Sequence, residues 1–179
     1  MVKVTISGPP GSGTSTLVEK LSSELNWTSL NGGEVFREEA KIRGISVEVL
    51  SEIAKSDINI DKSLDDLLKD RMNSENSPDI IESRLSGWWA SELGLNCFRI
   101  WITVSDEERA KRIQNREGGD YEDCLIRSIK RQMDDKERYL KLYDIDLDDL
   151  SPYNLIIDAD EMDANDVFEL VYSNINGEE

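Results

Sequence analysis

Hydrophobic and polar positions follow two different periods along the chain. Alternation at every second residue over 3–7 and over 98–104 predicts buried strands. Leucines four residues apart over 14–25 form one apolar stripe, which is typical of a helix. Another helix is expected after the 98–104 strand, where Ser105 and Glu108 have the spacing of a capping box. By the same criteria the remaining expected strands are 79–82 and 154–158, and the remaining helices are 34–43, 47–54, 61–72, 124–143 and 166–175.

The order of these elements indicates a fold class. Helices separate the expected strands, and this arrangement produces a mostly parallel sheet with helices on both faces. We therefore expect an α/β protein with residues 1–179 in one domain, because this length suits a single core. In such sheets ligands bind at the carboxyl ends of the strands.

A glycine-rich segment with the sequence GPPGSGTST lies between the first strand and the first helix, at 8–16. Phosphate-binding loops have the pattern G-x-x-x-x-G-K-[ST] in this same setting. Its glycines allow backbone amides to point inward, and the N-terminus of the following helix adds partial positive charge. Ser15 takes the position of the hydroxyl that binds Mg²⁺, but Thr14 stands where the pattern has lysine.

We expect this loop to bind the phosphates of ATP, and an ordinary strand-to-helix turn is the alternative. Without the lysine, other cations must meet the β- and γ-phosphates. The residues expected to bind phosphate are Gly8, Pro9, Pro10, Gly11, Ser12, Gly13, Thr14, Ser15 and Thr16.

Composition argues against several classes of function. The formal net charge of −17 would repel a nucleic-acid backbone, so no nucleic-acid partner is expected. No apolar stretch approaches the ~20 residues of a membrane helix, and no signal-peptide pattern is visible at the start. Histidine is absent, which excludes imidazole bases and histidine metal sites. Cys97 and Cys124 lack metal-ligand spacing, and we expect free thiols in a reducing cytoplasm.

Positive charge is concentrated in the middle of the sequence. Residues 142–179 contain twelve acids and no lysine or arginine, whereas residues 99–141 contain eleven bases and ten acids. An anionic ligand is therefore expected at the middle segment. Helical spacing places Arg109, Arg112 and Arg116 on one helix face, and Arg131, Asp135 and Arg138 on one face of the next helix.

Arginine suits phosphate because its planar fork binds two oxygens at once and keeps its charge. Solvated helix faces with internal ion pairs are the alternative for both stripes. The break at Gly118 and Gly119, directly after the first stripe, favours a mobile lid.

Three further charged residues follow expected strands. Arg37 lies just past a second strand region, for which no bounds are predicted, and Arg84 lies just past the third, at 79–82. Both positions are carboxyl ends of strands, where an acceptor phosphate would be expected. Glu82 ends an apolar run, which is the position of the acid that holds a Mg²⁺-bound water in P-loop enzymes. Surface arginines and a helix-capping acid are the alternatives.

On these residues the chain resembles the archaeal-type cytidylate (CMP) kinases, a branch of the P-loop nucleoside monophosphate kinases. That branch itself has threonine at the loop lysine position, so Thr14 supports the resemblance. Gly32 and Ser83 depart from it, because the family often has a small hydroxyl residue and a glycine there. The matching segments run in the family's order over nearly the whole chain: ISGPPGSGTST at 6–16, GEVFR at 33–37, INID at 58–61, IESRLSGWW at 81–89, ERAKRIQNREG at 108–118, IKRQMDDKERY at 129–139 and YDIDLDDLSPYNLIID at 143–158.

The resemblance implies a three-layer P-loop NTPase fold with a five-stranded parallel sheet, acceptor-binding helices over 31–75 and a short lid over 109–121. It implies transfer of the γ-phosphoryl group of ATP to CMP or dCMP. Mg²⁺ would be held by Ser15 and, through water, by Glu82. The catalytic residues would be Arg109, Arg112, Arg131 and Arg138, with Arg116 in the lid. The CMP-binding residues would be Arg37, Asp61, Arg84, Arg131, Asp135 and Arg138. Separately from the resemblance, we expect a monomer.

Two other functions remain open from the residues alone. A kinase that phosphorylates a small-molecule hydroxyl would need an acid as base, for which Asp61 is the candidate. A nucleotide-dependent switch would need an Asn-Lys-x-Asp motif, and the sequence contains no Asn-Lys pair. A CMP kinase needs no base, because the attacking phosphate oxygen is already an anion.

Overall fold

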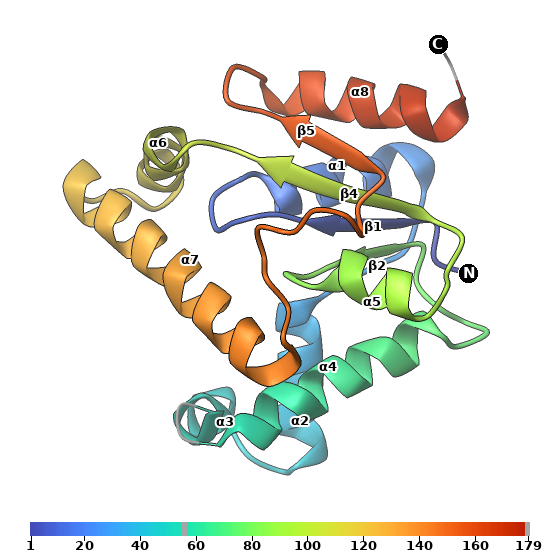
Figure 1. Ribbon diagram of the computed structural model, residues 1–179, viewed down its shortest axis with the longest axis vertical. Coiled ribbons are helices and arrows are strands. Elements are labelled where there is room, and N and C mark those ends of the chain that lie inside the picture. Colours follow the sequence, from blue (N-terminus) through green and yellow to red (C-terminus); the bar gives the residue numbers. More distant parts are fainter. Residues whose placement is uncertain (55–56, 178–179) are drawn as a thin grey trace.

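The computed structural model describes residues 1–54 and 57–177, so residues 55–56 and 178–179 of the predicted domain lie outside the described residues. One parallel sheet has the strand order β2-β3-β1-β4-β5 (Figure 1). The predicted α/β class with a five-stranded parallel sheet is thereby confirmed. Its strands are β1 (Val4–Ser7), β2 (Ser29–Asn31), β3 (Ile80–Glu82), β4 (Phe98–Thr103) and β5 (Leu155–Asp158).

Alternation along the strands divides the core between the two faces of the sheet. Val4 and Ile6 of β1 pack with α1 (Thr14–Leu25) and α8 (Ala164–Asn176). Ile81 of β3 belongs to a second cluster with Leu85 and with Trp89 of α5 (Ser86–Glu92). The sheet therefore separates two hydrophobic layers, as period-two strands between helices predict.

The remaining helices extend one end of the sheet. α2 (Gly32–Ile42), α3 (Val47–Ala54) and α4 (Ile58–Met72) form a lobe with a small core of its own, made by Ala40, Leu50 and Ile60. α6 (Asp106–Glu117) is followed by the long helix α7 (Tyr121–Tyr143), which runs from α6 toward this lobe (Figure 1).

Several helices begin earlier than their apolar pattern predicts. α2 begins at Gly32 rather than at residue 34, because the Asn31 side chain and Glu34 form a capping box. Aspartate side chains also cap the starts of α4, α7 and α8, at Asp57, Asp120 and Asp163, and at α8 a capping box is again present. Apolar periodicity locates the buried stripe of a helix, whereas its first turn is polar and is set by the cap.

Cys97 and Cys124 are both buried and unpaired, and burial raises the pKa of the Cys97 thiol. Within residues 1–54 and 57–177, every helix is too short or too polar to cross a lipid bilayer.

Candidate active site

The glycine-rich loop joins β1 to α1 at the carboxyl edge of the sheet, between the ends of β3 and β4. Gly11 and Gly13 have φ angles of 86° and 93°, which a residue with a side chain rarely adopts. Gly13 is also the N-cap of α1 and supplies no side-chain hydrogen bond to it. The first amides of α1 are consequently left for a ligand, at the positive end of the helix dipole.

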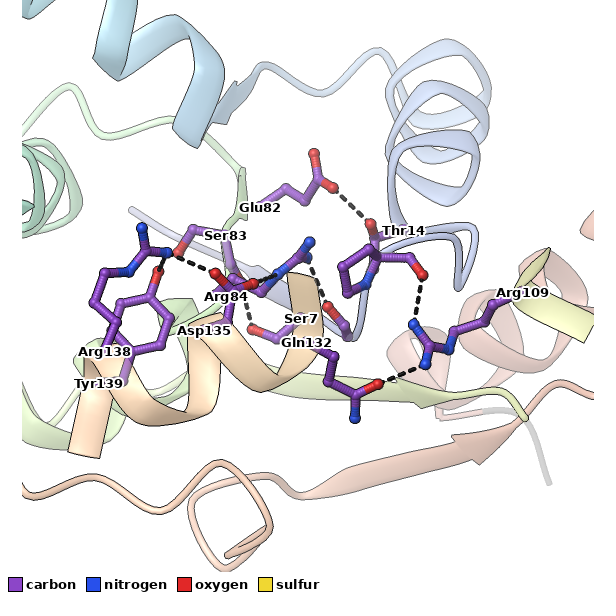
Figure 2. A network of polar contacts seen from close by, with 12 residues as sticks. Ser7, Thr14, Glu82, Ser83, Arg84, Arg109, Gln132, Asp135, Arg138 and Tyr139 are labelled. Atoms are coloured by element: carbon purple, nitrogen blue, oxygen red, sulfur yellow. Dashed lines mark hydrogen bonds and ion pairs between the residues drawn. The ribbon is translucent and has the colours of Figure 1, made fainter. Parts of the chain in front are cut away.

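Glu82 at the end of β3 lies directly beside the loop. Thr14 Oγ1 donates to Glu82 Oε1 at 2.6 Å (Figure 2). Ser15 Oγ donates to the same oxygen at 3.1 Å. Ser15 and Glu82 were predicted to act together, whereas the Thr14 contact was not predicted. The residue that replaces the lysine is therefore bound to the acid of the site.

These oxygen donors fit Mg²⁺, which prefers hydroxyl, carboxylate, phosphate and water oxygens. In the described part of the chain, no group of three or more His, Cys, Asp or Glu side chains is placed to hold a metal. An ion at Ser15 and Glu82 would thus take most of its ligands from phosphate and water, as is usual for Mg²⁺ at nucleotide sites.

Asp135 of α7 joins two of the predicted arginines. Its Oδ2 lies 2.9 Å from Arg84 Nε, and its Oδ1 lies 2.7 Å from Arg138 Nη2 (Figure 2). Arg84 Nη1 also donates to the Gly8 carbonyl at 2.7 Å, so this guanidinium is held between the loop and α7. Arg138 Nη1 lies 3.9 Å from the Asp61 carboxylate of α4. Four predicted residues thus form one charged group opposite the loop.

The local environment shifts the pKa of several groups here. Burial raises the pKa of Asp61; the Arg138 charge opposes this effect and the Asp135 charge adds to it. Burial also raises the pKa of Tyr139 to about 12, so this phenol keeps its proton near neutral pH. Asp65 has a raised pKa because it is buried, although hydrogen bonds from other side chains oppose the shift.

The loop and the charged group border one cavity of about 780 Å³, a size suited to small ligands. The predicted residues that line it are Pro9, Pro10, Gly11, Gly13, Thr14, Ser15, Thr16, Asp61, Glu82, Arg84, Arg116, Arg131, Asp135 and Arg138. Other residues that line it were not predicted from the sequence, including Asn31, Phe36, Asp65 and Tyr139. Asp65 could have been found, because it follows Asp61 by four residues on the same helix.

A second cavity of about 710 Å³ lies on the other side of the loop, and the sequence analysis did not predict it. Arg112 and Arg116 of α6 line it together with Met162 and Val167. The segment between β5 and α8 has no phosphate-binding pattern, so nothing in its sequence points to a ligand site. The cavity arises because α6 packs beside this segment in the fold. Arg116 lines both cavities and lies at their junction.

Two predicted arginines lie outside both cavities. Arg37 is exposed, and its guanidinium lies near Gly33 at the start of α2. A Cβ built on Gly33 would be 3.4 Å from Arg37 Nη1. Arg109 is 0% exposed and donates through Nη1 to the Pro10 carbonyl at 2.9 Å. Arg109 therefore lies behind the phosphate loop, where the sequence had predicted a residue that touches the transferred group.

Comparisons with known proteins agree with this geometry. The family model described as "AAA domain" matches residues 7–130. The cytidylate kinase of Archaeoglobus fulgidus is 36% identical over 170 residues, which cover 95% of this chain and 92% of that protein. The cytidylate kinase of Haloarcula marismortui is 37% identical over 167 residues, which cover 93% and 85%.

Solved structures show the same fold at much lower identity. An uncharacterized protein from Eubacterium ventriosum superimposes with a TM-score of 0.73 at 18% identity, with 98% of each chain covered. The shikimate kinase of Bacteroides thetaiotaomicron gives a TM-score of 0.61 at 15% identity, with 96% of this chain and 98% of that chain covered. The fold, the phosphate loop and the 36% and 37% identities over nearly the full length lead to one conclusion: this chain belongs to the archaeal-type cytidylate kinases, within the P-loop kinases.

Proposed function

We propose that this protein transfers the γ-phosphoryl group of ATP to CMP or dCMP, giving ADP and CDP or dCDP. One observation supports this reaction above the others: a single cavity is lined both by the phosphate loop and by the group of Arg84, Asp135 and Arg138. Transfer between two phosphates requires donor and acceptor sites that face each other across one space. Membership of the cytidylate kinase family supports CMP as the acceptor.

In this proposal ATP extends from the phosphate loop into the second cavity. The amides of the loop and of the first turn of α1 bind the β- and γ-phosphates, and the adenosine contacts Met162 and Val167. Arg112 lines the same cavity beside the loop, where its Nη1 donates to the Ser12 carbonyl, so it would lie on the phosphate side of ATP. Arg116 lines both cavities, so it would lie beside the phosphates of ATP, where the two cavities join.

The acceptor phosphate would bind to Arg84, Arg131 and Arg138, all of which line the first cavity. Asp61 lines the same cavity and belongs to the acceptor-binding set. Arg37 lies at the start of the acceptor lobe and would have to turn its side chain inward to join this set.

The chemistry then rests on position and charge. The attacking oxygen of CMP is an anion near neutral pH, since the second pKa of a phosphate is about 6. Arg112, Arg131 and Arg138 would neutralise the group in transfer when the site closes. Mg²⁺, held by Ser15 and through water by Glu82, would compensate phosphate charge and orient the γ-phosphoryl group. Asp61 faces Arg138 at 3.9 Å, which favours a charge partner over the base that a hydroxyl kinase would need.

The proposal includes two moving parts. In the acceptor-binding region 31–75, Val35, Leu68 and Met72 pack into the second hydrophobic cluster of the sheet, whereas Ala40, Leu50 and Ile60 form a small core of their own, which supports movement of the part around α3. The lid region 109–121 ends at Gly118 and Gly119, which have φ angles of 76° and 97° and open space around them. Both glycines accommodate the backbone rotation that a hinge requires.

We also place the protein in the cytoplasm as a monomer. Two buried, unpaired thiols are typical of a reducing compartment. A net charge of −17 opposes the association of identical copies.

A coupled assay of ADP release across CMP, dCMP, UMP, AMP and GMP tests the function. We expect the highest rates with CMP and dCMP. Activity with AMP or GMP but not with CMP would contradict the acceptor assignment, and no ADP release with any monophosphate would contradict the kinase reaction. A small-molecule hydroxyl as the preferred acceptor would favour the hydroxyl kinase.

Substitution of two arginines tests the site itself. Arg84→Ala and Arg131→Ala should each lower kcat/KM for CMP by about 10²-fold, because each removes a preorganised charge from the acceptor site. Arg127→Ala is the matched control, since Arg127 is an exposed arginine of α7 that lines neither cavity. Wild-type rates in both site variants would exclude the proposed acceptor site.

A further inference from the structure

Three carbonyl groups of the phosphate loop, at every second residue from Gly8 to Ser12, each accept a hydrogen bond from an arginine. The arginines come from the end of β3 and from α6, and two of them, Arg84 and Arg109, approach the loop from different sides (Figure 2). The three pairs are Arg84 Nη1 with the Gly8 oxygen at 2.7 Å, Arg109 Nη1 with the Pro10 oxygen at 2.9 Å, and Arg112 Nη1 with the Ser12 oxygen at 3.3 Å.

This arrangement determines which loop amides face the ligand. In a planar trans peptide the carbonyl and the following N–H point in opposite directions. Pro9 and Pro10 have no N–H, and the Ser12 N–H donates to the Pro9 carbonyl at 3.2 Å. The Gly11 and Gly13 amides are therefore the ones that arginine–carbonyl bonds can turn inward, and both glycines line the first cavity.

Arg109 differs from the other two because it has no access to either cavity. Its side chain is 0% exposed, where a charge is unfavourable unless it is paired, and among the described residues its Nε has no hydrogen-bond partner. Besides the Pro10 carbonyl it contacts the Asp106 carboxylate of α6 and Gln132 Oε1 of α7, the latter at 2.5 Å. A cation is thus buried on the reverse side of the loop and joins it to two helices.

We propose that Arg109 is a positioning residue that holds the phosphate loop in its phosphate-binding conformation and partly replaces the missing lysine. It acts through the Pro10–Gly11 peptide, whose oxygen it binds. A cation on the carbonyl side polarises the peptide, so the Gly11 N–H becomes a stronger donor toward phosphate. Gln132 connects the same guanidinium to α7, next to Arg131 in the sequence. The inference rests on the proposed function only in taking ATP as the ligand of the loop.

The test compares ATP with adenosine, which lacks phosphates, by calorimetric titration of wild type and Arg109→Met. We expect Arg109→Met to weaken ATP binding about tenfold or more, the effect of losing a hydrogen bond to a charged group, and to leave adenosine binding unchanged. A merely structural role would affect both ligands together.

Arg99→Met is the matched control. Arg99 also donates to backbone carbonyls, those of Pro152 at 2.6 Å and Leu95 at 3.4 Å, but lines neither cavity. We expect this variant to keep wild-type affinity for ATP even if its melting temperature falls. Arg109→Lys, which keeps the charge and one donor, should recover part of the affinity that Arg109→Met loses.

Equal ATP affinity in wild type and folded Arg109→Met would overturn the inference, as would an equal loss for ATP and adenosine. If Arg109→Met does not fold, the amide NMR signal of Gly11 decides. In the ATP complex of Arg109→Lys this signal should move from its wild-type position while that of Gly94 stays, and an unchanged Gly11 signal would overturn the inference. A wild type that binds ATP but releases no ADP with CMP contradicts only the proposed function, because affinity is measured without an acceptor.

Discussion

Among single residues, Thr14 best shows how the site differs from a loop with lysine. Its hydroxyl and that of Ser15 donate to one oxygen of Glu82. A lysine here would place a cation against that carboxylate, whereas two hydroxyls leave the acid able to bind a metal-bound water.

Ser15→Ala tests the metal role of this cluster. Removal of the hydroxyl should lower kcat by about 10²-fold and raise the Mg²⁺ concentration needed for half-maximal rate, because the site loses a ligand that positions charge. Titration of the rate with MgCl₂ measures both effects. Ser23→Ala, an exposed serine of the same helix, should leave the titration unchanged. An unaltered Mg²⁺ dependence in Ser15→Ala would rule out this role.

Asp65 should give the protein a measurable pH dependence of stability. Its carboxylate accepts hydrogen bonds from Tyr143 at 2.7 Å and Trp89 at 3.3 Å, yet burial raises its pKa. The folded state therefore binds this proton more tightly than the unfolded state does. The stability that the residue contributes is full below its unfolded pKa and is lost as pH rises through its folded pKa.

In Asp65→Asn this titration is absent, so the melting temperature of the variant minus that of wild type should become more positive between about pH 4 and about pH 6. Thermal unfolding followed by circular dichroism at both pH values measures the difference. A difference that stays constant, or that becomes more negative, would contradict the raised pKa.

At the level of whole elements, α5 lies unusually close to the segment before β5. A Cβ added to Gly87 would lie 2.1 Å from Cε1 of the Tyr153 ring. Trp101 of β4 also packs against Tyr153, with ring centroids 5.1 Å apart, so the tyrosine has little room to retreat. A glycine at this position allows the helix to approach β1 and β4.

Gly87→Ala should consequently destabilise the protein by about 1–3 kcal/mol or more, since the core must shift to admit one methyl group. Urea unfolding measures the change in the free energy of unfolding. Gly32→Ala is a suitable comparison for stability, because a Cβ there would meet Ser83 Cβ at an ordinary 3.9 Å. Equal stability of the two variants would show that Tyr153 moves aside freely.

How much of the fold was predictable also varies from element to element. The strand over 98–104 and the helix over 14–25 have strong apolar periods, and the structure contains both at β4 and α1. β2 has only three residues, none of them buried, so its period is too short to give it bounds. The first turns of α2, α4, α7 and α8 were missed because they are polar and depend on caps.

The whole molecule has a strongly asymmetric charge distribution. The net charge is −17, and residues 142–179 contain twelve acids and no base. Mutual repulsion of these carboxylates disfavours the compact state, and salt screens repulsion between exposed charges. Exposed ion pairs also weaken in salt, but each contributes little to stability.

The melting temperature should therefore rise as NaCl increases from about 0.01 M to about 0.15 M, over which the Debye length falls from about 30 Å to about 8 Å. Differential scanning calorimetry measures the shift, and choline chloride should have the same effect if screening is the cause. A melting temperature that falls with salt would mean that attractive pairs outweigh the repulsion.

The sequence by itself determined the chemistry that depends on neighbours along the chain. Glycines at special backbone angles, a hydroxyl beside a helix N-terminus and arginines at helical spacing are local features. In the structure, residues of the loop over 8–16 and the group of Arg131, Asp135 and Arg138 border the same cavity. Only the tertiary structure decided the position of each arginine of α6 relative to the loop. Arg109 and Arg116 share a helix face but stand roughly 10 Å apart along its axis. The loop packs against the first turn of α6, so Arg109 is buried behind it while Arg116 reaches both cavities.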